Sequence, residues 1–523
     1  MQFTPAPHIT QNWQLTKPAA SGRRGMVVSQ AKSAAEAGVA VLDAGGNAVD
    51  AALATALALA TVEPWNSGLG GIGHAVIHRA GETRAETVDF GPTAPAALNP
   101  NLFKLTGRVA ADLFGWPEVE GDVNIHGPLS FVIPSAVAGY EEMHRRWGKL
   151  PLLEIAAPAI ALAKRGLPED WYTSLKIGVS APILKKYAES ARIYLRDGLP
   201  PMPPYQGGLN YFRLGNLLDT LERLAKASWR DFYDGEIAAG IVADVKTLGG
   251  VLSAEDLRNC KARVSPATEV TWRGRTLQLS GPLTAAPTAA DVLRRMGDAR
   301  VGATPDAAWY LALARALKAA YAQRLSSLGD AEPQAAESCT THITVADADG
   351  TMVALTTTLL SSMGSRTVLP ATGILMNNGV MWFDPQPGQP NSIGPGKRPL
   401  TNMFSVILRD GARPWIAAGA SGGRRIMAAV LQLVSFVADF GMMPEAAAHQ
   451  PRIDVSGSNL VTADRRLAPE IMRALEADGP LQIVEHAVLP VNFACPNLIL
   501  QADGQRTGIS DAISPWSAAV AQA

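Results

Sequence analysis

Glu337-Ser338-Cys339-Thr340-Thr341-His342-Ile343-Thr344-Val345 runs through an Asp349-Gly350 turn to Thr356-Thr357-Thr358, and this stretch decides how the chain folds. Apolar residues on both sides of the turn predict a β-hairpin, with Thr340 opening the first strand and Thr358 near the end of the second. The start of one antiparallel strand lies beside the end of its partner. The sequence therefore predicts two threonine hydroxyls close together at one sheet edge.

Two threonines at a sheet edge can be structural, because threonine is common in strands. They can also be catalytic, because the α-amino group of a threonine can activate its own hydroxyl once the preceding peptide bond is cut. The hairpin then predicts a precursor that cleaves itself before Thr340 into a large chain, 1–339, and a small chain, 340–523, which together form one fold. Residues 332–336, small and containing Pro333, are expected to form an exposed linker before the cut.

Three further motifs follow the hairpin, and they are Asn377-Asn378, Pro395-Gly396-Lys397-Arg398-Pro399-Leu400 and Gly419-Ala420-Ser421-Gly422-Gly423. Together with Thr340-Thr341-His342, this set resembles the γ-glutamyltranspeptidase family of N-terminal-nucleophile hydrolases, over about residues 25–452. Helices and strands occur in blocks along the chain, which indicates an α+β fold. The resemblance implies a four-layer αββα sandwich built from both cleaved halves.

The resemblance also implies a catalytic set. Thr340 matches the nucleophile, Thr358 matches the hydroxyl that orients it, and Gly422 and Gly423 match the backbone N–H pair that stabilises the oxyanion. Glycines just before a helix can present unhindered N–H donors, and losing one such donor typically costs about 3 kcal/mol. Asn377 is expected to fix a loop.

The acyl pocket is where the chain departs from the family. The γ-glutamyl enzymes hold their substrate with an arginine, an asparagine and an aspartate, at positions where this chain has Gly91, Leu360 and Trp382. Two family serines become Thr401 and Asn402, which can still hydrogen-bond an acyl group. A glutamyl zwitterion bound here would leave both of its charges without partners, which is costly.

We therefore expect an amidohydrolase with the family's catalytic groups and a different acyl pocket. Branches of that kind resemble oxamate amidohydrolase and the cephalosporin acylases. Leu360 and Trp382 would shrink the pocket, which favours a small carboxylate amide of the oxamate type, cleaved to oxalate and ammonia. A glutaryl or cephalosporin acylase, and a γ-glutamyl hydrolase or transferase acting on glutathione-like donors, are the alternatives. The candidate anchors for a substrate carboxylate are Arg366, Arg398 and Arg425, although structural salt bridges would explain them equally well.

A rival of another class uses the same glycine-rich segment. Gly419-Ala420-Ser421-Gly422-Gly423 fits the nucleophile elbow of a serine hydrolase, and Asp454 and His486 follow in the right order. Against it, an α/β-hydrolase needs alternating strand-helix units upstream, whereas small-residue helices dominate the first half. A non-catalytic binding protein on the same scaffold is the other alternative.

Gly68-Leu69-Gly70-Gly71-Ile72-Gly73 matches the string of a dinucleotide site, but here a helix precedes it and a strand follows, which is the reverse of the required order. His74 and His78 have the spacing of a zinc helix, yet on a strand they would lie about 13 Å apart. We expect neither cofactor nor metal.

Composition limits the remaining possibilities. Hydrophobic residues are 47% and charged residues 18% of 523, with a net charge of -1, so we expect a large core and no nucleic-acid or anionic-membrane partner. A small-molecule substrate is then expected. The two cleaved chains are expected to form a heterodimer, which could dimerise further. The start lacks a secretory pattern, and Cys260, Cys339 and Cys495 are few and far apart, so a cytoplasmic protein is expected.

Helical spacing of small apolar residues predicts helices over 29–62, interrupted at Gly45-Gly46-Asn47, and over 153–163. The other expected elements are strands at 270–279, 373–378, 403–408 and 415–418 and a helix at 424–440.

Overall fold

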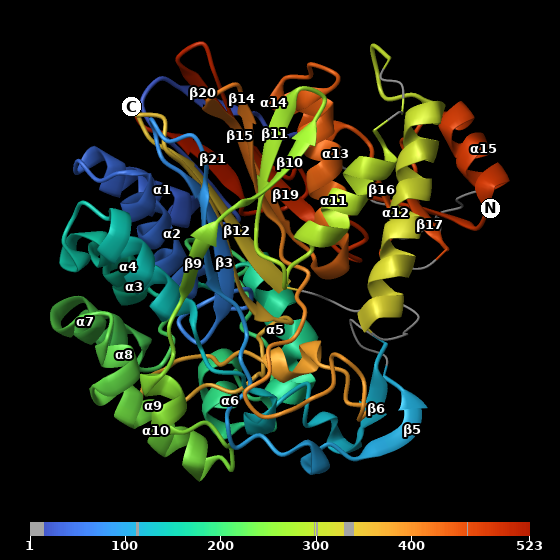
Figure 1. The fold of residues 1–523 in the computed structure, drawn as a ribbon. Helices are drawn as coiled ribbons and strands as arrows, with labels where there is room; N and C mark the ends of the chain where they lie inside the picture. Colours follow the sequence, from blue (N-terminus) through green and yellow to red (C-terminus); the bar gives the residue numbers. More distant parts are fainter. Residues whose placement is uncertain (1–14, 111–114, 298, 300–301, 329–338, 458) are drawn as a thin grey trace.

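The computed structural model describes residues 15–523 except 111–114, 298, 300, 301, 329–338 and 458. The predicted linker at 332–336 lies outside the described residues. Two seven-stranded sheets are stacked face to face at the centre, and helices cover the outer face of each (Figure 1). This is the predicted α+β fold, a four-layer αββα sandwich.

All neighbouring strands of the two large sheets pair antiparallel. The first sheet contains, in order, β1 (Ala20–Gly22), β20 (Gln505–Ser510), β19 (Cys495–Ala502), β15 (Arg413–Ser421), β14 (Ser405–Asp410), β11 (Arg275–Leu279) and β10 (Thr268–Trp272). The second contains β21 (Ala518–Ala521), β2 (Met26–Ser29), β12 (Cys339–Ala346), β13 (Met352–Leu360), β3 (Ile72–His78), β4 (Glu86–Phe90) and β9 (Arg263–Pro266). Strands from both predicted halves are therefore interleaved in each sheet.

The helices fall into two groups. Those along the second sheet and below it are α1 (Lys32–Asp43), α2 (Ala48–Val62), α3 (Ala136–Trp147), α4 (Leu152–Arg165), α5 (Trp171–Leu184), α6 (Ala188–Tyr194), α7 (Leu217–Ala227), α8 (Asp231–Asp234), α9 (Glu236–Thr247) and α10 (Ala254–Arg258). Those along the first sheet are α11 (Ala286–Arg295), α12 (Ala307–Leu328), α13 (Ile426–Ala438), α14 (Pro444–His449) and α15 (Pro469–Asp478). Small sheets are formed by β16 (Ile453–Asp454), β17 (Val461–Asp464) and β18 (Leu481–Val484), by β5 (Leu105–Val109) and β6 (Pro117–Val119), and by β7 (Leu167–Pro168) and β8 (Tyr211–Phe212).

Alternation along the strands explains the layers. In β12, Ile343 and Val345 join the core under α1 and α2, whereas Ala346 joins the apolar cluster between the two sheets. In β15, Ala417 faces that middle cluster and Ile416 faces α13. Because side chains of a strand alternate between its faces, each central strand contributes to two layers of core at once.

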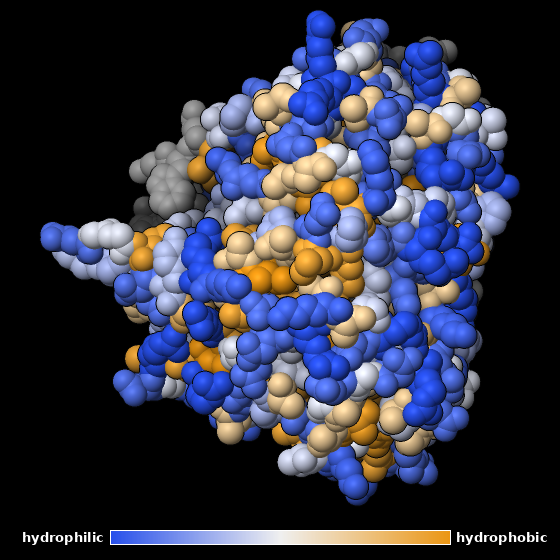
Figure 2. Space-filling model, turned by 90° about the vertical axis from the view of Figure 1, so that its left-hand side faces the viewer, coloured by the Kyte–Doolittle hydropathy of each residue, from blue (hydrophilic) through white to orange (hydrophobic). Residues whose placement is uncertain are grey.

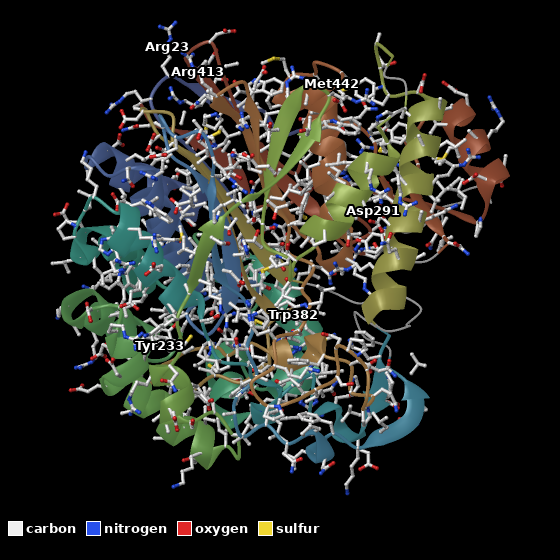
Figure 3. All side chains as sticks on the ribbon, in the orientation of Figure 1. Arg23, Tyr233, Asp291, Trp382, Arg413 and Met442 are labelled. Carbon is white, nitrogen blue, oxygen red and sulfur yellow. The ribbon has the colours of Figure 1, made fainter. Side chains whose placement is uncertain are left out.

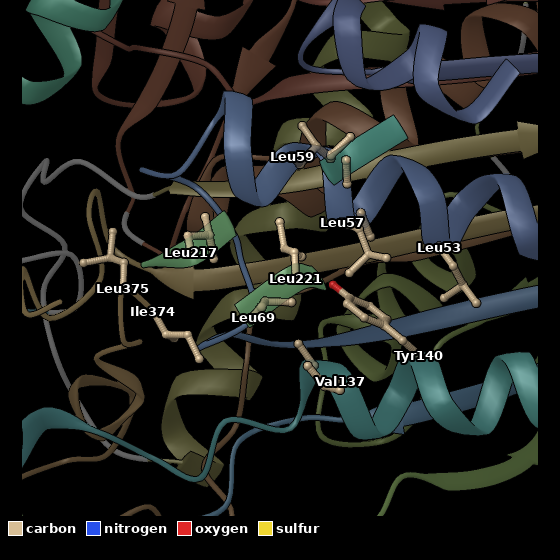
Figure 4. Packing of buried hydrophobic residues seen from close by; sticks show 14 of the residues in the cluster. Leu53, Leu57, Leu59, Leu69, Val137, Tyr140, Leu217, Leu221, Ile374 and Leu375 are labelled. Atoms are coloured by element: carbon tan, nitrogen blue, oxygen red, sulfur yellow. The ribbon is translucent and has the colours of Figure 1, made fainter. Parts of the chain in front are cut away.

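The helix beneath the nucleophile strand, α2, is buried along its whole length. Asn47 caps it by accepting hydrogen bonds from the backbone N–H groups of Val49 and Asp50, and Asp50 completes the capping box. Small residues let the neighbouring helix approach closely, since a Cβ on Gly38 of α1 would lie 2.3 Å from the hydroxyl of Thr55. Figure 4 shows leucines of α2 packed above Val137 and Tyr140 of α3.

Three sequence predictions need correction. The stretch 270–279 is not one strand but parts of β10 and β11, which pair antiparallel around a turn at Arg273 and Gly274. Residues 373–378 do not form a strand, because only single bridges, Gly70 to Met376 and Val368 to Leu375, pair this stretch with other segments. The side chain of Asn377 forms hydrogen bonds with the backbone of Val132 and Gly70. These bonds hold the segment in place of the backbone hydrogen bonds that a strand would make. Ser29 belongs to β2 and not to the first helix, which begins at Lys32.

Hydrophilic side chains cover much of the face shown in Figure 2, with hydrophobic residues interspersed and gathered toward its middle. Among the described helices, none combines the length and the apolar character that a bilayer crossing requires.

Candidate active site

The hairpin of β12 and β13 brings the two predicted threonines together. The hydroxyl of Thr340 donates to the hydroxyl of Thr358, with 3.2 Å between the oxygens, and both side chains are buried. The backbone N–H of Leu360 also donates to Thr358 Oγ1, at 2.8 Å. Leu360 reaches this position with a φ of 87°, a left-handed conformation that is rare for a branched side chain. Thr358 is thus placed to fix the orientation of the Thr340 hydroxyl, although the roles of both remain predictions.

Thr341 and Thr357, the neighbours of the two candidate threonines, face the other side of the sheet, because side chains alternate along a strand. Thr341 points to the helix side, where its hydroxyl contacts Glu63 at the end of α2. Thr357 accepts a hydrogen bond from the hydroxyl of Tyr140 on α3. Thr340 and Thr358 therefore share the face turned toward the first sheet, and their neighbours anchor the hairpin to the helices.

His342 lies two residues after the candidate nucleophile but is not placed to act as its base. Its ring packs between the sheets against Gly419, where a Cβ would lie 2.2 Å from the ring, and its Nδ1 is 2.8 Å from the hydroxyl of Thr356. Burial lowers the pKa of His342 to about 3, so the ring is neutral. Its role is to join the two sheets below the site.

The candidate oxyanion glycines stand where β15 ends and a short turn leads into α13. Gly422 has a φ of 138° and Gly423 a φ of 59°, conformations that favour glycine. A Cβ on Gly422 would lie 2.6 Å from the Cβ of Ala494, so the chain passes too closely for a side chain. Gln30 connects this turn to the nucleophile strand, since its amide donates to Ser421 and its carbonyl oxygen lies 2.9 Å from the hydroxyl of Thr341.

The geometry contradicts the serine-elbow alternative. Ser421 accepts its bond from Gln30, His486 contacts Asp511 and Arg452, and Asp454 accepts from Ser456. Among the described residues, no hydrogen bond joins Ser421 to His486 or His486 to Asp454. The sheets are also antiparallel, whereas an α/β-hydrolase carries its elbow on a mainly parallel sheet.

Two of the predicted acyl-pocket residues lie in one apolar cluster. Leu360 and Trp382 are both almost fully buried and pack with Ile72, Val132 and Phe383. Figure 3 labels Trp382 near the lower ends of the central strands. Leu360 is the last residue of β13, two residues after Thr358, so this cluster lies at the Thr358 end of the hairpin. The members of this cluster are all apolar, whereas a charged head group needs ionic partners.

Gly91 lies directly after β4 at the same sheet end. β13, β3 and β4 are adjacent, so at about 4.8 Å per strand Gly91 is about 10 Å from Thr358. Arg398 fills the space beside it: a Cβ on Gly91 would lie 3.0 Å from Nη2 of Arg398, and that nitrogen donates to Asp89 at 2.6 Å. Burial opposes ionisation of Asp89, yet His74 and Arg398 hold its pKa below the usual value.

A cavity of about 330 Å³ opens beside this ion pair. Its lining includes Gly91, Ser135, Asn259, Lys261, Arg263 and Arg398. Arg398 therefore reaches both an internal carboxylate and an open space. Of the other candidate anchors, Arg366 donates to the hydroxyl of Ser361 at 2.7 Å and Arg425 donates to the carbonyl of Val491.

Thr401 and Asn402 are held by a residue that sequence analysis missed. Arg324 of α12 donates to the carbonyl of Thr401 at 2.8 Å and to the side-chain oxygen of Asn402 at 3.2 Å. Thr401 also donates its hydroxyl to the carbonyl of Leu283 at 3.0 Å. Arg324 is 9% exposed, and burial lowers its pKa to about 10. A signal was present, because Arg324 continues the buried helical stripe of Leu313, Leu317 and Tyr321.

Asn377 and the glycine run behave as predicted. The side-chain oxygen of Asn377 accepts from Val132 and Gly379, and its nitrogen donates to Gly70 and Val132, so the amide fixes loops. Gly68, Gly70 and Gly71 lie between α2 and β3, and Gly73 lies within β3; a Cβ on Gly71 would lie 2.7 Å from the carbonyl oxygen of Thr358. They permit close backbone contact beneath the site.

A buried threonine at the start of a central strand of an αββα sandwich, hydrogen-bonded to a second threonine, is the arrangement expected of an N-terminal-nucleophile hydrolase. The model of the γ-glutamyltranspeptidase family matches residues 34–339 and 331–519, and the chain belongs to that family. It is a hydrolase that acts on amide bonds.

Proteins similar to this chain include glutathione hydrolases and acylases. A glutathione hydrolase proenzyme of Escherichia coli is 28% identical over 94% of this chain and 90% of its own length. An acylase ACY 1 proenzyme of a Pseudomonas species is 29% identical over 91% of this chain and 90% of its own length. A crystal structure of cephalosporin acylase from Bacillus halodurans superposes with a TM-score of 0.83 over 99% of both chains at 22% identity, which establishes the shared fold.

Replacing Thr358 by alanine should slow both self-cleavage and turnover by roughly 10- to 1000-fold, the range for losing one positioning hydrogen bond at a reacting group. Serine at this position keeps the hydroxyl and should be milder. Rates are measured by denaturing gel for cleavage and by product release for turnover. An alanine variant with wild-type rates would remove Thr358 from the site.

Replacing Arg324 by methionine should lower the free energy of unfolding by roughly 2 to 4 kcal/mol, because buried oxygens of Thr401 and Asn402 lose their donor. Arg315 on the same helix has a side chain 62% exposed and pairs with Asp478, so its methionine variant is the matched control and should cost less than about 1 kcal/mol. Chemical denaturation measures both. Equal losses for the two variants would contradict the assigned role of Arg324.

Proposed function

We propose that the chain is a self-processing amidohydrolase with Thr340 as N-terminal nucleophile, acting on a small carboxylate amide such as oxamate. The working enzyme is then a heterodimer of residues 1–339 and 340–523. The observation that carries the substrate choice is the Arg398–Asp89 pair, which lies against Gly91, where a Cβ would meet Nη2 of Arg398 at 3.0 Å, and which puts a cation on the cavity beside Gly91.

The proposed reaction gives each of these groups one role. The hydroxyl of Thr340 attacks the amide carbon while its freed α-amino group takes the proton, and the N–H groups of Gly422 and Gly423 stabilise the oxyanion. The C–N bond breaks and ammonia leaves with that proton. Water then hydrolyses the threonine ester, which releases the acid, oxalate in the case of oxamate, and restores the hydroxyl.

The acyl side supports a compact substrate. Leu360 and Trp382 present hydrocarbon, Asn402 offers an amide, and Arg398 supplies a cation toward the neighbouring cavity. A planar two-carbon acid needs one cation and a few hydrogen-bond donors, and it carries no ammonium group that would need an anion.

The test is a panel of primary amides with released ammonia as the readout. Oxamate and similar short carboxylate amides should be hydrolysed, and Thr340→Ala should release none. Failure of the short amides, with release from a glutaryl or γ-glutamyl amide, would overturn the substrate assignment.

The second candidate is an acylase acting on a larger acyl group. It is favoured by the cavity of about 330 Å³ beside Gly91 and Arg398, which is larger than a two-carbon acid requires. Likeness to the Pseudomonas acylase points the same way. Preference for a glutaryl amide in the panel would select it.

A further inference from the structure

A row of hydrogen-bonded side chains runs behind the candidate nucleophile. Oε2 of Glu63 lies 2.5 Å from Oγ1 of Thr341, which lies 2.9 Å from Oε1 of Gln30, and the amide nitrogen of Gln30 donates to Ser421. Thr341 directly follows Thr340, and Ser421 directly precedes Gly422. The row therefore joins the start of the nucleophile strand to the start of the oxyanion turn, across the two sheets.

The number of protons in this row depends on Glu63. The hydroxyl of Thr341 has one proton and faces two acceptor oxygens, one on Glu63 and one on Gln30. If Glu63 is neutral, it donates to Thr341, Thr341 donates to Gln30 and Gln30 donates to Ser421, so every bond is made. If Glu63 is ionised, it accepts a hydrogen bond from Thr341. Gln30 must then turn its amide over, so that it donates to Thr341 and accepts from the hydroxyl of Ser421.

All four side chains are buried, with Glu63 1% and Thr341 0% exposed. The charged or titratable groups nearby are Lys176 of α5, and His486 and Cys495, which line a cavity of about 60 Å³ with Lys176, Gln30 and Ser421. Burial raises the pKa of Glu63 to about 7, opposed by hydrogen bonds from Thr341 and Asn66 and by the charge of Lys176. Glu63 thus changes its charge near neutral pH.

We propose that Glu63 is a positioning residue whose neutral form holds the nucleophile strand in register with the oxyanion turn through Thr341, Gln30 and Ser421. Ionisation of Glu63 reverses every donor and acceptor in this row and requires the buried amide of Gln30 to turn over, which disturbs the alignment. The inference rests on the proposed function, because it concerns the alignment of Thr340 with Gly422 and Gly423. Glu63 touches no reacting atom, so it acts only through its neighbours.

The test follows self-cleavage of the full chain, produced as uncleaved precursor by cell-free translation, between pH 5 and 9. Glu63→Gln keeps a donor toward Thr341 and cannot ionise. The ratio of the wild-type rate to the Glu63→Gln rate should be constant below about pH 6 and fall roughly 10-fold by pH 8, because about one-tenth of Glu63 stays neutral one pH unit above its pKa of about 7. Glu63→Ala should be slower roughly 10-fold at every pH.

Asp454→Asn is the matched control. Asp454 is likewise fully buried, and burial raises its pKa to about 6, but it bonds Ser456 and takes no part in the row. This variant should keep the wild-type pH dependence. Thermal unfolding of all variants at pH 6 verifies that they are folded.

The outcomes separate the two proposals. A wild-type chain that never cleaves overturns the proposed function, and the inference falls with it. A wild-type chain that cleaves while Glu63→Gln keeps the same loss of rate above pH 7 overturns the inference alone. If the loss of cleavage rate above pH 7 disappears in Asp454→Asn, the titrating carboxyl is Asp454 and not Glu63, and this result also overturns the inference.

Discussion

Thr340→Ala is expected to remain a single chain of 523 residues, whereas the wild-type protein resolves into fragments of 339 and 184 residues, the second being 523 minus 339. The physical reason is that the hydroxyl of Thr340 is the attacking group for the peptide bond after Cys339. Its oxygen attacks the carbonyl carbon, the amide becomes an ester, and water cleaves the ester and leaves a free α-amino group. Alanine has no oxygen to attack, and an uncatalysed peptide bond is stable on the timescale of any preparation.

Denaturing mass analysis measures this directly, and Thr340→Ser is the control because it keeps the hydroxyl. We expect the serine variant to yield the same two fragments. An alanine variant that still cleaves at the same bond would place the nucleophile elsewhere. A wild-type protein that is active while uncleaved would remove the α-amino base from the mechanism.

The second large effect is discrimination between acyl groups. A γ-glutamyl amide is expected to show a kcat/KM lower by roughly 10³ or more than that of the best small carboxylate amide, because charge-assisted bonds to its head group are worth about 1.5 to 3 kcal/mol each. Gly91, Leu360 and Trp382 supply none of those bonds. The measurement compares γ-glutamyl-p-nitroanilide with the best amide of the panel, and equal efficiencies would contradict the assignment.

The Arg398–Asp89 pair sharpens this expectation. Gly91→Arg should not create γ-glutamyl activity, because its Cβ would lie 3.0 Å from Nη2 of Arg398 and 3.1 Å from Oδ1 of Asp89. The new side chain would crowd a partly buried ion pair, and its guanidinium would compete with Arg398 for Asp89. Gly91→Ala is the control for crowding without added charge. A large gain of γ-glutamyl hydrolysis in Gly91→Arg would show that the lost arginine alone explains the preference.

The sequence alone determined the hairpin, the α+β class and the family. These follow from local rules: alternation and an Asp-Gly turn give β12 and β13, small residues at helical spacing with an Asn47 capping box give α2, and the motif set gives the family. The antiparallel pairing of the hairpin also put Thr340 and Thr358 close together at one end of the sheet. The strand predicted at 373–378 was wrong because the apolar side chains of this segment pack within a loop. An apolar pattern alone does not distinguish such a loop from a strand.

Only the tertiary structure decided what surrounds the threonines. Arg398 lies 309 positions from Asp89, Thr341 lies 278 positions from Glu63, and Gln30 lies 391 positions from Ser421. No spacing rule relates residues so far apart, because their contact depends on how the two sheets stack and which helix end meets which strand. Burial then sets the charge state of Glu63 and His342, and burial is a property of the packed chain, not of the residue.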